Sequence, residues 1–120
     1  MKVLVTGSRD WTDTLAVKEE ILGVMESHEG PYTLIEGGCS GADRIARKLA
    51  TEYGWTIITE KADWSQGRMA GPIRNTKMIE KHKPNIALCF RKNNSRGTAD
   101  CVNKLRKYGI HLQLREEVSP

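Results

Sequence analysis

The chain has 120 residues, of which 38% are hydrophobic and 28% charged, and its formal net charge is +4. These values fit one globular domain with one core. They exclude a membrane-spanning helix, because no apolar run approaches the roughly 20 residues that such a helix needs. The run Met1–Val5 is too short for a signal peptide, so we expect a cytoplasmic protein with no membrane partner. The mild positive charge suits an anionic ligand or weak nucleic-acid contact.

Cysteine usage excludes two further classes of protein. The three cysteines, Cys39, Cys89 and Cys101, form an odd set without a C-x-x-C pair. Neither a disulfide framework nor a zinc site is indicated, and we expect no metal and no resident cofactor. Cys89 and Cys101 have the pattern of core residues, and Cys39 that of a small residue in a tight turn.

Short apolar runs alternate with helical patterns along the whole chain. The runs predict strands at residues 3–6, 32–36, 55–59, 86–90 and 110–114. The spacing predicts helices between them, including one that begins at Pro72 and ends before Pro84. We expect a single domain over residues 1–114, followed by a flexible tail at 115–120.

This alternation predicts an α/β fold with a doubly wound parallel sheet and helices on both faces. The first and fourth strands are the most apolar and should be central, which gives a five-stranded order of 3-2-1-4-5. In such a sheet the chain reverses direction between strands 1 and 4. Ligands bind at this point, beyond the carboxyl ends of the strands.

Three glycine-bearing turns follow predicted strands and precede predicted helices. Glycine allows close approach to a phosphate, and the first N–H groups of a helix point toward it. The turns do not match G-x-G-x-x-G or a P-loop, which disfavours an ordinary dehydrogenase or ATPase. We predict that these turn residues bind the ligand: Gly7, Ser8, Arg9, Gly37, Gly38, Ser40, Gly41, Arg96, Gly97 and Thr98.

Arginines and polar side chains in the same loops add candidate phosphate ligands. A guanidinium fork suits phosphate, so we add Arg68 and Arg74 to the predicted site, together with the Asn75 amide. Trp11 could stack on a base or pack the loop, and we expect Trp64 to pack its loop.

Carboxylates near the turns are candidates for ribose binding or for catalysis. Glu36 ends a strand directly before the glycines and is the better ribose candidate, with Asp43 also in the predicted site. Asp63, in a longer loop, is the candidate general acid or base. The histidines lie near helix ends or in the last strand, so no Ser/His/Asp or Cys/His arrangement can be built.

Five motifs stand in an order that resembles a known family. They are Gly7–Trp11, Glu36–Asp43, Ala62–Trp64, Ala70–Asn75 and Gly97–Asp100. Together they resemble the YspA-type branch of the SLOG superfamily over nearly the whole chain. The resemblance implies a Rossmann-like nucleotide-binding domain of a kind common in phages and bacteria. Its relatives include the "lonely guy" phosphoribohydrolases, DNA-processing protein A and sensors of nucleotide signals. A homodimer or higher homo-oligomer is compatible with this, because relatives are often dimeric.

The catalytic half of the phosphoribohydrolase pattern is missing. Those enzymes resemble this chain in an upstream helical arginine, which Arg74 matches, and in a Gly-Thr pair, which Gly97 and Thr98 match. Their Pro-Gly-Gly stretch is absent, and the position of their glutamate falls on Cys101. A thiol cannot replace a carboxylate that supports departure of a base from ribose.

Three functions remain open from the sequence. The first is a binding protein for a nucleotide or an ADP-ribose-like signal, which the glycine turns and arginines favour. The second is a nucleoside-phosphate N-glycosidic hydrolase, which requires a well-placed carboxylate. The third is single-stranded nucleic-acid binding, which requires a longer basic groove with stacking aromatics.

Overall fold

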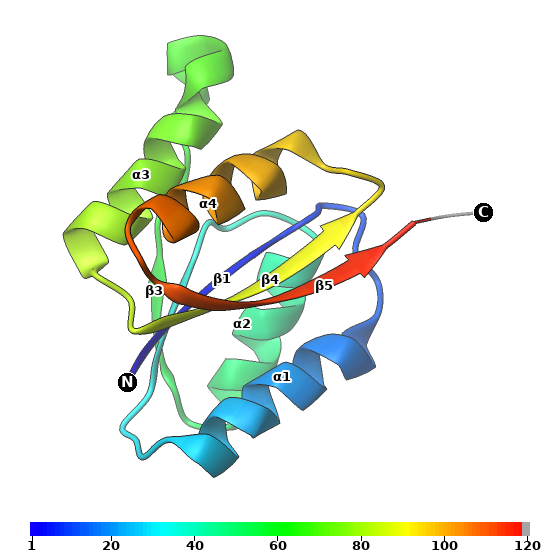
Figure 1. Ribbon diagram of the computed structural model, residues 1–120, viewed down its shortest axis with the longest axis vertical. Coiled ribbons are helices and arrows are strands. Elements are labelled where there is room, and N and C mark those ends of the chain that lie inside the picture. Colours follow the sequence, from blue (N-terminus) through cyan, green and yellow to red (C-terminus); the bar gives the residue numbers. More distant parts are fainter. Residues whose placement is uncertain (119–120) are drawn as a thin grey trace.

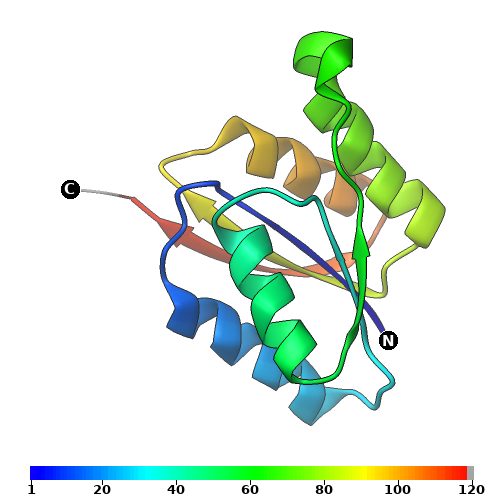
Figure 2. The same ribbon diagram turned by 180° about the vertical axis from the view of Figure 1, so that it is seen from behind.

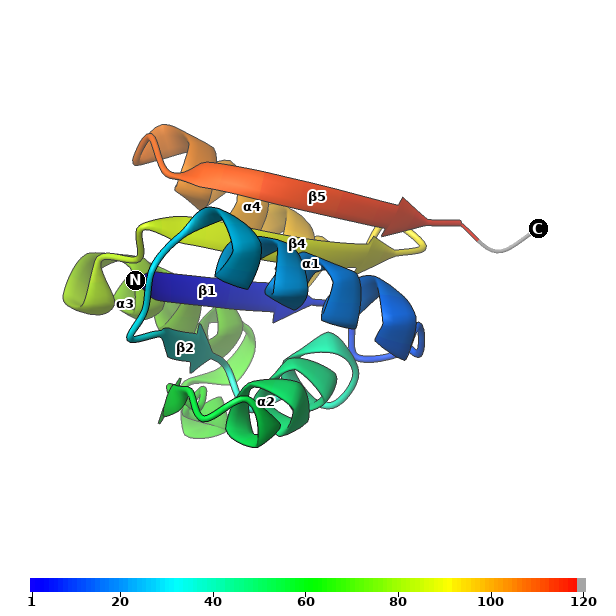
Figure 3. The same ribbon diagram turned by 90° about the horizontal axis from the view of Figure 1, so that it is seen from below.

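A five-stranded sheet forms the centre of the computed structural model, which describes residues 1–118. All strand pairs are parallel and the order is β3-β2-β1-β4-β5, so the predicted fold class and strand order are confirmed (Figure 1). Figure 3 shows β1, β4 and β5 running side by side in the same direction. The strands are β1 Lys2–Gly7, β2 Thr33–Glu36, β3 Thr56–Thr59, β4 Ile86–Lys92 and β5 His111–Glu117.

Two helices cover each face of the sheet. The pair α1 (Thr14–Ser27) and α2 (Ala42–Glu52) packs on one face, and α3 (Ala70–His82) and α4 (Arg96–Lys107) pack on the other. A short 3-10 helix, η1 (Trp64–Met69), leads into α3 and projects beyond the body of the domain (Figures 1 and 2). None of the helices in the described residues has the length and apolar character needed to cross a membrane.

The alternation of side chains along the central strands divides the core into two layers. Val3 and Val5 of β1 pack with α1 and α2, whereas Leu4 between them packs with α3 and α4. All three side chains are fully buried. Because successive strand residues point to opposite faces, only a sheet covered on both sides can bury all three. The first strand is a nearly continuous apolar run because helices cover it on both faces.

The beginning of α3 differs from the sequence-based prediction. We expected Pro72 to be the first helical residue, but α3 begins at Ala70 and η1 precedes it. Gly67, inside η1, has φ 73° and ψ −147°, a non-helical conformation that puts a kink in the segment leading into α3. Pro72 is then the third residue of α3, where its missing N–H costs nothing because first-turn N–H groups have no partner within the helix. The predicted end before Pro84 is confirmed, since α3 ends at His82.

The predicted flexible tail at residues 115–120 is wrong for its first part. Strand β5 continues to Glu117, and Arg115, Glu116 and Glu117 are in register with residues 90–92 of β4. Charge pairs favour this extension: Arg115 contacts Glu19 and Glu20 on α1, and Arg91 lies 3.9 Å from Glu116. Residues 115–117 lack the apolar pattern of a strand because their side chains form ion pairs. The sequence therefore contains no signal that β5 continues through them. Residues 119 and 120 of the predicted tail lie outside the described residues.

Candidate functional site

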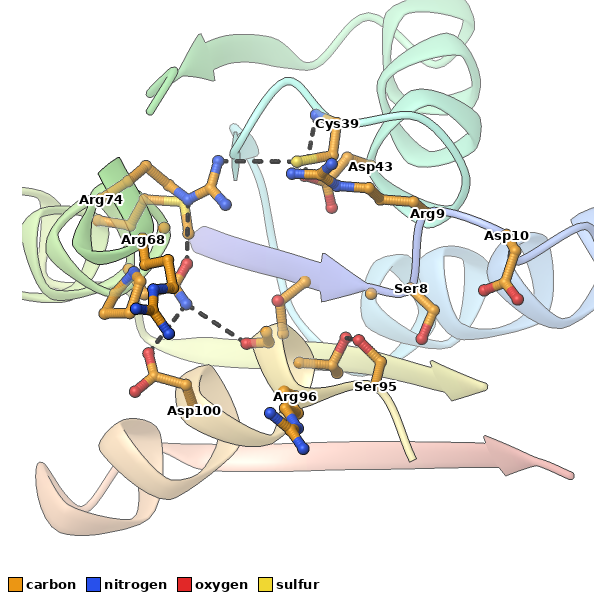
Figure 4. A pocket seen from close by; sticks show the side chains of 18 of the residues that line it. Ser8, Arg9, Asp10, Cys39, Asp43, Arg68, Arg74, Ser95, Arg96 and Asp100 are labelled. Atoms are coloured by element: carbon orange, nitrogen blue, oxygen red, sulfur yellow. Dashed lines mark hydrogen bonds between the residues drawn. The ribbon is translucent and has the colours of Figure 1, made fainter. Parts of the chain in front are cut away.

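A cavity of about 490 Å³ opens at the carboxyl ends of the central strands (Figure 4). Its walls come from the turn after β1, the start of α2, the η1 and α3 segments and the start of α4. The topology therefore gathers these segments at the predicted switch point between β1 and β4. Ten of the predicted ligand-binding residues line this cavity: Gly7, Ser8, Arg9, Asp43, Arg68, Arg74, Asn75, Arg96, Gly97 and Thr98.

A second, adjoining cavity of about 340 Å³ takes in the turn after β2. It shares Arg9, Cys39, Trp64 and Arg74 with the first cavity, so the two form one crevice. Of the remaining predicted residues, Gly37, Gly38 and Ser40 line this second part. Glu36, Gly41 and Asp63 line neither part, and neither do the histidines of the described chain.

The start of α4 presents free backbone donors at the cavity. Ser95 is the N-cap residue, but its side chain does not cap the helix, and the first helical bond runs from Ala99 N to the Ser95 carbonyl. The N–H groups of the first turn therefore have no partner within the helix. Gly97 has open space around its Cα, since an added Cβ would meet no atom within 4 Å. Free N–H groups and the positive end of the helix dipole favour an anion here.

Four guanidinium groups surround the cavity without a carboxylate partner. The ion pairs of residues 1–118 do not include Arg9, Arg68, Arg74 or Arg96. By contrast, the lining carboxylate of Asp100 is already occupied by other side chains. Asn75 donates to it at 3.1 Å, and the Lys104 ammonium lies 3.0 Å away. The electrostatic balance of the cavity is therefore positive.

Arg74 and Arg9 are both held in place by the protein. The Arg74 guanidinium donates to the Gly37 carbonyl at 2.8 Å and to Asn75 Oδ1 at 3.0 Å. The Arg9 guanidinium lies 5.1 Å from the ring centroid of Trp64. Trp64 is 56% exposed, so our expectation that it packs its loop is wrong. Trp11 is the packing residue, buried against Phe90.

The glycine turn after β2 uses its own donors internally, contrary to the prediction that it offers them to a phosphate. Asp43 Oδ2 accepts from Gly37 N at 3.1 Å and from Cys39 N at 3.4 Å. Glu36 Oε2 accepts from Gly38 N. Two side-chain carboxyls therefore fill the anion position that the G-G-x-x-G pattern creates.

Glu36 cannot contact a ribose in this structure, which corrects the sequence-based prediction. Its side chain is fully buried, and Thr59 donates to Oε1 at 2.7 Å. Thr59 is the residue in register with Glu36 on the neighbouring strand β3. Residues in register on neighbouring parallel strands point to the same face of the sheet, so the Glu36 carboxyl lies beside Thr59 and does not line the crevice.

Gly41 does not line the crevice; it allows the turns after β1 and β2 to pack closely against each other. It has φ 74°, and a Cβ added there would lie 2.2 Å from the Ser8 carbonyl oxygen. At Gly7, an added Cβ would lie 2.3 Å from Cβ of Ala42. The turns after β1 and β2 can therefore touch only because both positions are glycine.

Asp63, the candidate catalytic residue, caps η1 outside the crevice. Its Oδ1 accepts from Ser65 N at 3.1 Å and from Ser65 Oγ at 2.6 Å, and these bonds lower the pKa of Asp63. Burial raises the pKa of Cys101 to about 12, so this residue is a neutral thiol and not a substitute for a glutamate. No group of three or more His, Cys, Asp or Glu side chains in the described part of the chain is arranged to hold a metal ion.

Asp43 is the titratable group in the cavity wall that the sequence indicated least clearly. Its place in the first turn of α2 has an ordinary explanation in the helix dipole. In the structure it is 4% exposed, and its Oδ1 has no hydrogen-bond partner in the protein. Burial, and next the charge of Glu36, raise the pKa of Asp43 to about 7, although the N–H groups of Cys39 and Gly37 and the charge of Arg74 oppose the rise.

Comparison with known proteins places the chain in a family. It is 36% identical over 117 residues to the "Gene 61 protein" of Mycobacterium phage D29, and the match covers 91% of each chain. No solved structure matches significantly. Residues 1–67, from β1 into η1, match the model of the YspA, cpYpsA-related SLOG family. This match confirms the resemblance drawn from the motifs, and the chain belongs to that family.

Proposed function

We propose that the crevice binds a phosphate-bearing nucleotide or nucleotide-derived signal, of which AMP and ADP-ribose are representative. The observation that carries the proposal is the set of four guanidinium groups without carboxylate partners beside the uncapped start of α4. Membership of the SLOG family supports a nucleotide-related role. The cavity volume of about 490 Å³ lies within the range of sites that take small ligands.

The nucleoside part of such a ligand also has suitable contacts. Trp64 exposes its indole on the cavity wall, where a base can stack on an aromatic ring. Arginines and backbone N–H groups hold phosphate equally well in the ground state and in a transition state. Uniform binding of this kind gives affinity without rate acceleration, so we expect binding with slow or no turnover.

Gly97→Asp tests the phosphate position at the start of α4. The substitution is expected to weaken binding of AMP and ADP-ribose at least about tenfold, because it places a carboxylate among the groups that hold the anion. Folding should not suffer, since there is open space at Gly97 and an acidic residue is favourable in a first helical turn. Isothermal titration calorimetry measures the affinity, and thermal melting measures the fold.

Gly97→Asn is the matched control, because asparagine has the size of aspartate without its charge. Most of the expected tenfold loss of affinity should come from the added charge. We therefore expect Gly97→Asn to bind AMP and ADP-ribose several-fold more tightly than Gly97→Asp does. Equal affinities of the two variants would remove the start of α4 from the phosphate site. Failure of the wild-type protein to bind any member of a nucleotide panel would overturn the proposed function itself.

A second candidate function, hydrolysis of an N-glycosidic bond, is favoured by the carboxyl of Asp43. Its pKa of about 7 would allow proton transfer near neutral pH, and it lies in the cavity wall. Chromatography of AMP and ADP-ribose after incubation with the protein decides between the two functions. We expect no release of adenine at enzymatic rates. Release that is lost in Asp43→Asn and kept in Asp63→Asn would favour the hydrolase.

A further inference from the structure

The charged side chains that line the smaller part of the crevice are all cationic. Arg9, Lys61 and Arg74 lie in its wall, and no Asp or Glu of residues 1–118 does. The larger part, by contrast, has three aspartates in its wall beside its four arginines. The smaller part is therefore the more one-sidedly positive of the two, and the phosphate position at the start of α4 makes no use of it.

Lys61 is a cation without a carboxylate partner beside the turn after β2. Its side chain is exposed, and the ion pairs of residues 1–118 do not include it. The neighbouring carboxylate of Glu60 is occupied by side chains of α3. A Cβ added at Gly38 would lie 3.2 Å from Cγ of Lys61, so the glycine leaves room for the lysine stem along the cavity wall.

Arg74 is fixed in place and still has donors for a ligand. Its Nη1 donates to the Gly37 carbonyl at 2.8 Å and its Nε to Asn75 Oδ1 at 3.0 Å. Its Nη2 makes no hydrogen bond within residues 1–118. A guanidinium that is held in one orientation with free N–H groups is well suited to bind phosphate oxygens.

The buried carboxyls behind the turn after β2 do not occupy this part of the crevice. Glu36 lines neither part, and Asp43 lines only the larger one. Glu36 accepts from the N–H group of Gly38, and Asp43 from those of Gly37 and Cys39. Their bonded oxygens face the backbone of the turn, which leaves the cations of the smaller part available to a ligand.

The phosphate position at α4 and the smaller part of the crevice have no lining residue in common. Arg96 and Gly97 line only the larger part, and Lys61 lines only the smaller one. Figure 4 shows Arg9 on one side of β1 and Arg96 on the other. A ligand that fills both parts must therefore carry a second anionic group away from the first.

We propose that the smaller part of the crevice is a second phosphate subsite, so that the preferred ligand is a nucleotide with phosphate groups at two separate positions of its sugar. The proposal rests on the proposed function. The first phosphate lies at the start of α4, and the second contacts Lys61 and Arg74. The nucleoside between them lies along the wall that the two parts share.

Calorimetric titration of the wild-type protein with AMP, ADP and adenosine 3′,5′-bisphosphate tests the proposal. We expect the bisphosphate to bind at least about tenfold more tightly than AMP, because its second phosphate gains charge-assisted hydrogen bonds. ADP carries its second phosphate next to the first, and its extra charge should raise the affinity by no more than about threefold. An equal gain for ADP and the bisphosphate, or no gain for either, would overturn the proposal.

Lys61→Gln tests where the second phosphate lies. The variant is expected to bind the bisphosphate about fivefold more weakly than wild type and AMP less than about twofold more weakly, because only the bisphosphate reaches the lysine. Thermal melting should be unchanged, since Lys61 is exposed. An unchanged affinity for the bisphosphate, or an equal loss for AMP, would contradict the proposal.

Lys48→Gln is the matched control, because it removes the same charge elsewhere. Lys48 is exposed on α2, has no ion pair within residues 1–118 and lines neither part of the crevice. It should keep the wild-type affinity for both ligands, and a loss equal to that of Lys61→Gln would also overturn the second subsite. In all these cases AMP still binds and the proposed function stands. Absence of binding by all three ligands overturns both.

Discussion

Asp43→Asn is expected to stabilise the folded protein relative to wild type, and this gain should be about 2–3 kcal/mol larger at pH 8 than at pH 5. The reason is the proton on Asp43. In the unfolded chain this carboxyl has an ordinary pKa near 3.8, but burial and the charge of Glu36 raise its pKa in the fold to about 7. Asparagine is neutral at every pH and has the shape of the protonated carboxyl.

The sign follows from the protons that each state binds. Below pH 3.8 the carboxyl is protonated in both states and has no effect on stability. Between pH 3.8 and 7 the unfolded chain releases this proton and the folded chain keeps it, so stability falls as pH rises. The loss is about 1.4 kcal/mol per pH unit, and it is complete above pH 7. Between pH 5 and pH 8, wild type therefore loses stability that the asparagine variant keeps.

Urea denaturation at several pH values from 5 to 8 measures this difference directly. Asp63→Asn is the control, because asparagine caps a helix about as well as aspartate and the residue is fully exposed. It should show the wild-type loss of stability with rising pH. Parallel curves for wild type and Asp43→Asn would mean that Asp43 is ionised throughout this range.

The fold class and the strand order could be predicted from the sequence, because strands that are buried on both faces appear as continuous apolar runs. The apolar runs of β1 and β4 occur only where helices cover a strand on each side, and this alone made them central. The C-terminal half of β5 was missed because Arg115, Glu116 and Glu117 make ionic contacts in place of apolar ones. Ion pairs between different elements leave no repeating pattern in the sequence of either element, so they cannot be predicted from that sequence.

The candidate site was predictable in its location and only partly in its contacts. Parallel topology brings the ends of β1, β2 and β4 to one edge, so the convergence of Arg9, Arg74 and Gly97 followed from strand order. Strand order did not predict the hydrogen-bond partners of the N–H groups in the turn after β2. A G-G-x-x-G-A-D sequence has the same pattern whether its N–H groups face a phosphate or the protein's own carboxyls. Side-chain conformations of Glu36 and Asp43 decide between the two.

The contact between the turns after β1 and β2 is the part of the site that should tolerate substitution least. Gly41→Ala is expected to lower the free energy of unfolding by about 3–5 kcal/mol or to prevent folding. Two costs add at this position. Alanine is strained at φ 74° and ψ −129°, and its Cβ would lie 2.2 Å from the Ser8 carbonyl oxygen and 2.6 Å from that of Arg9. These are backbone atoms, so a side chain cannot simply rotate away.

Gly67→Ala separates the two costs, because the chain has nearly the same conformation there without the crowding. Gly67 has φ 73° and ψ −147°, and an added Cβ would meet nothing within 4 Å. This variant therefore carries the backbone strain alone, which is about 1–3 kcal/mol. Urea denaturation of both variants gives the difference, which measures how closely the two turns pack. If Gly41→Ala were no more destabilising than Gly67→Ala, the turns could separate freely, and the crevice would not be the rigid, preformed site on which binding of a nucleotide depends.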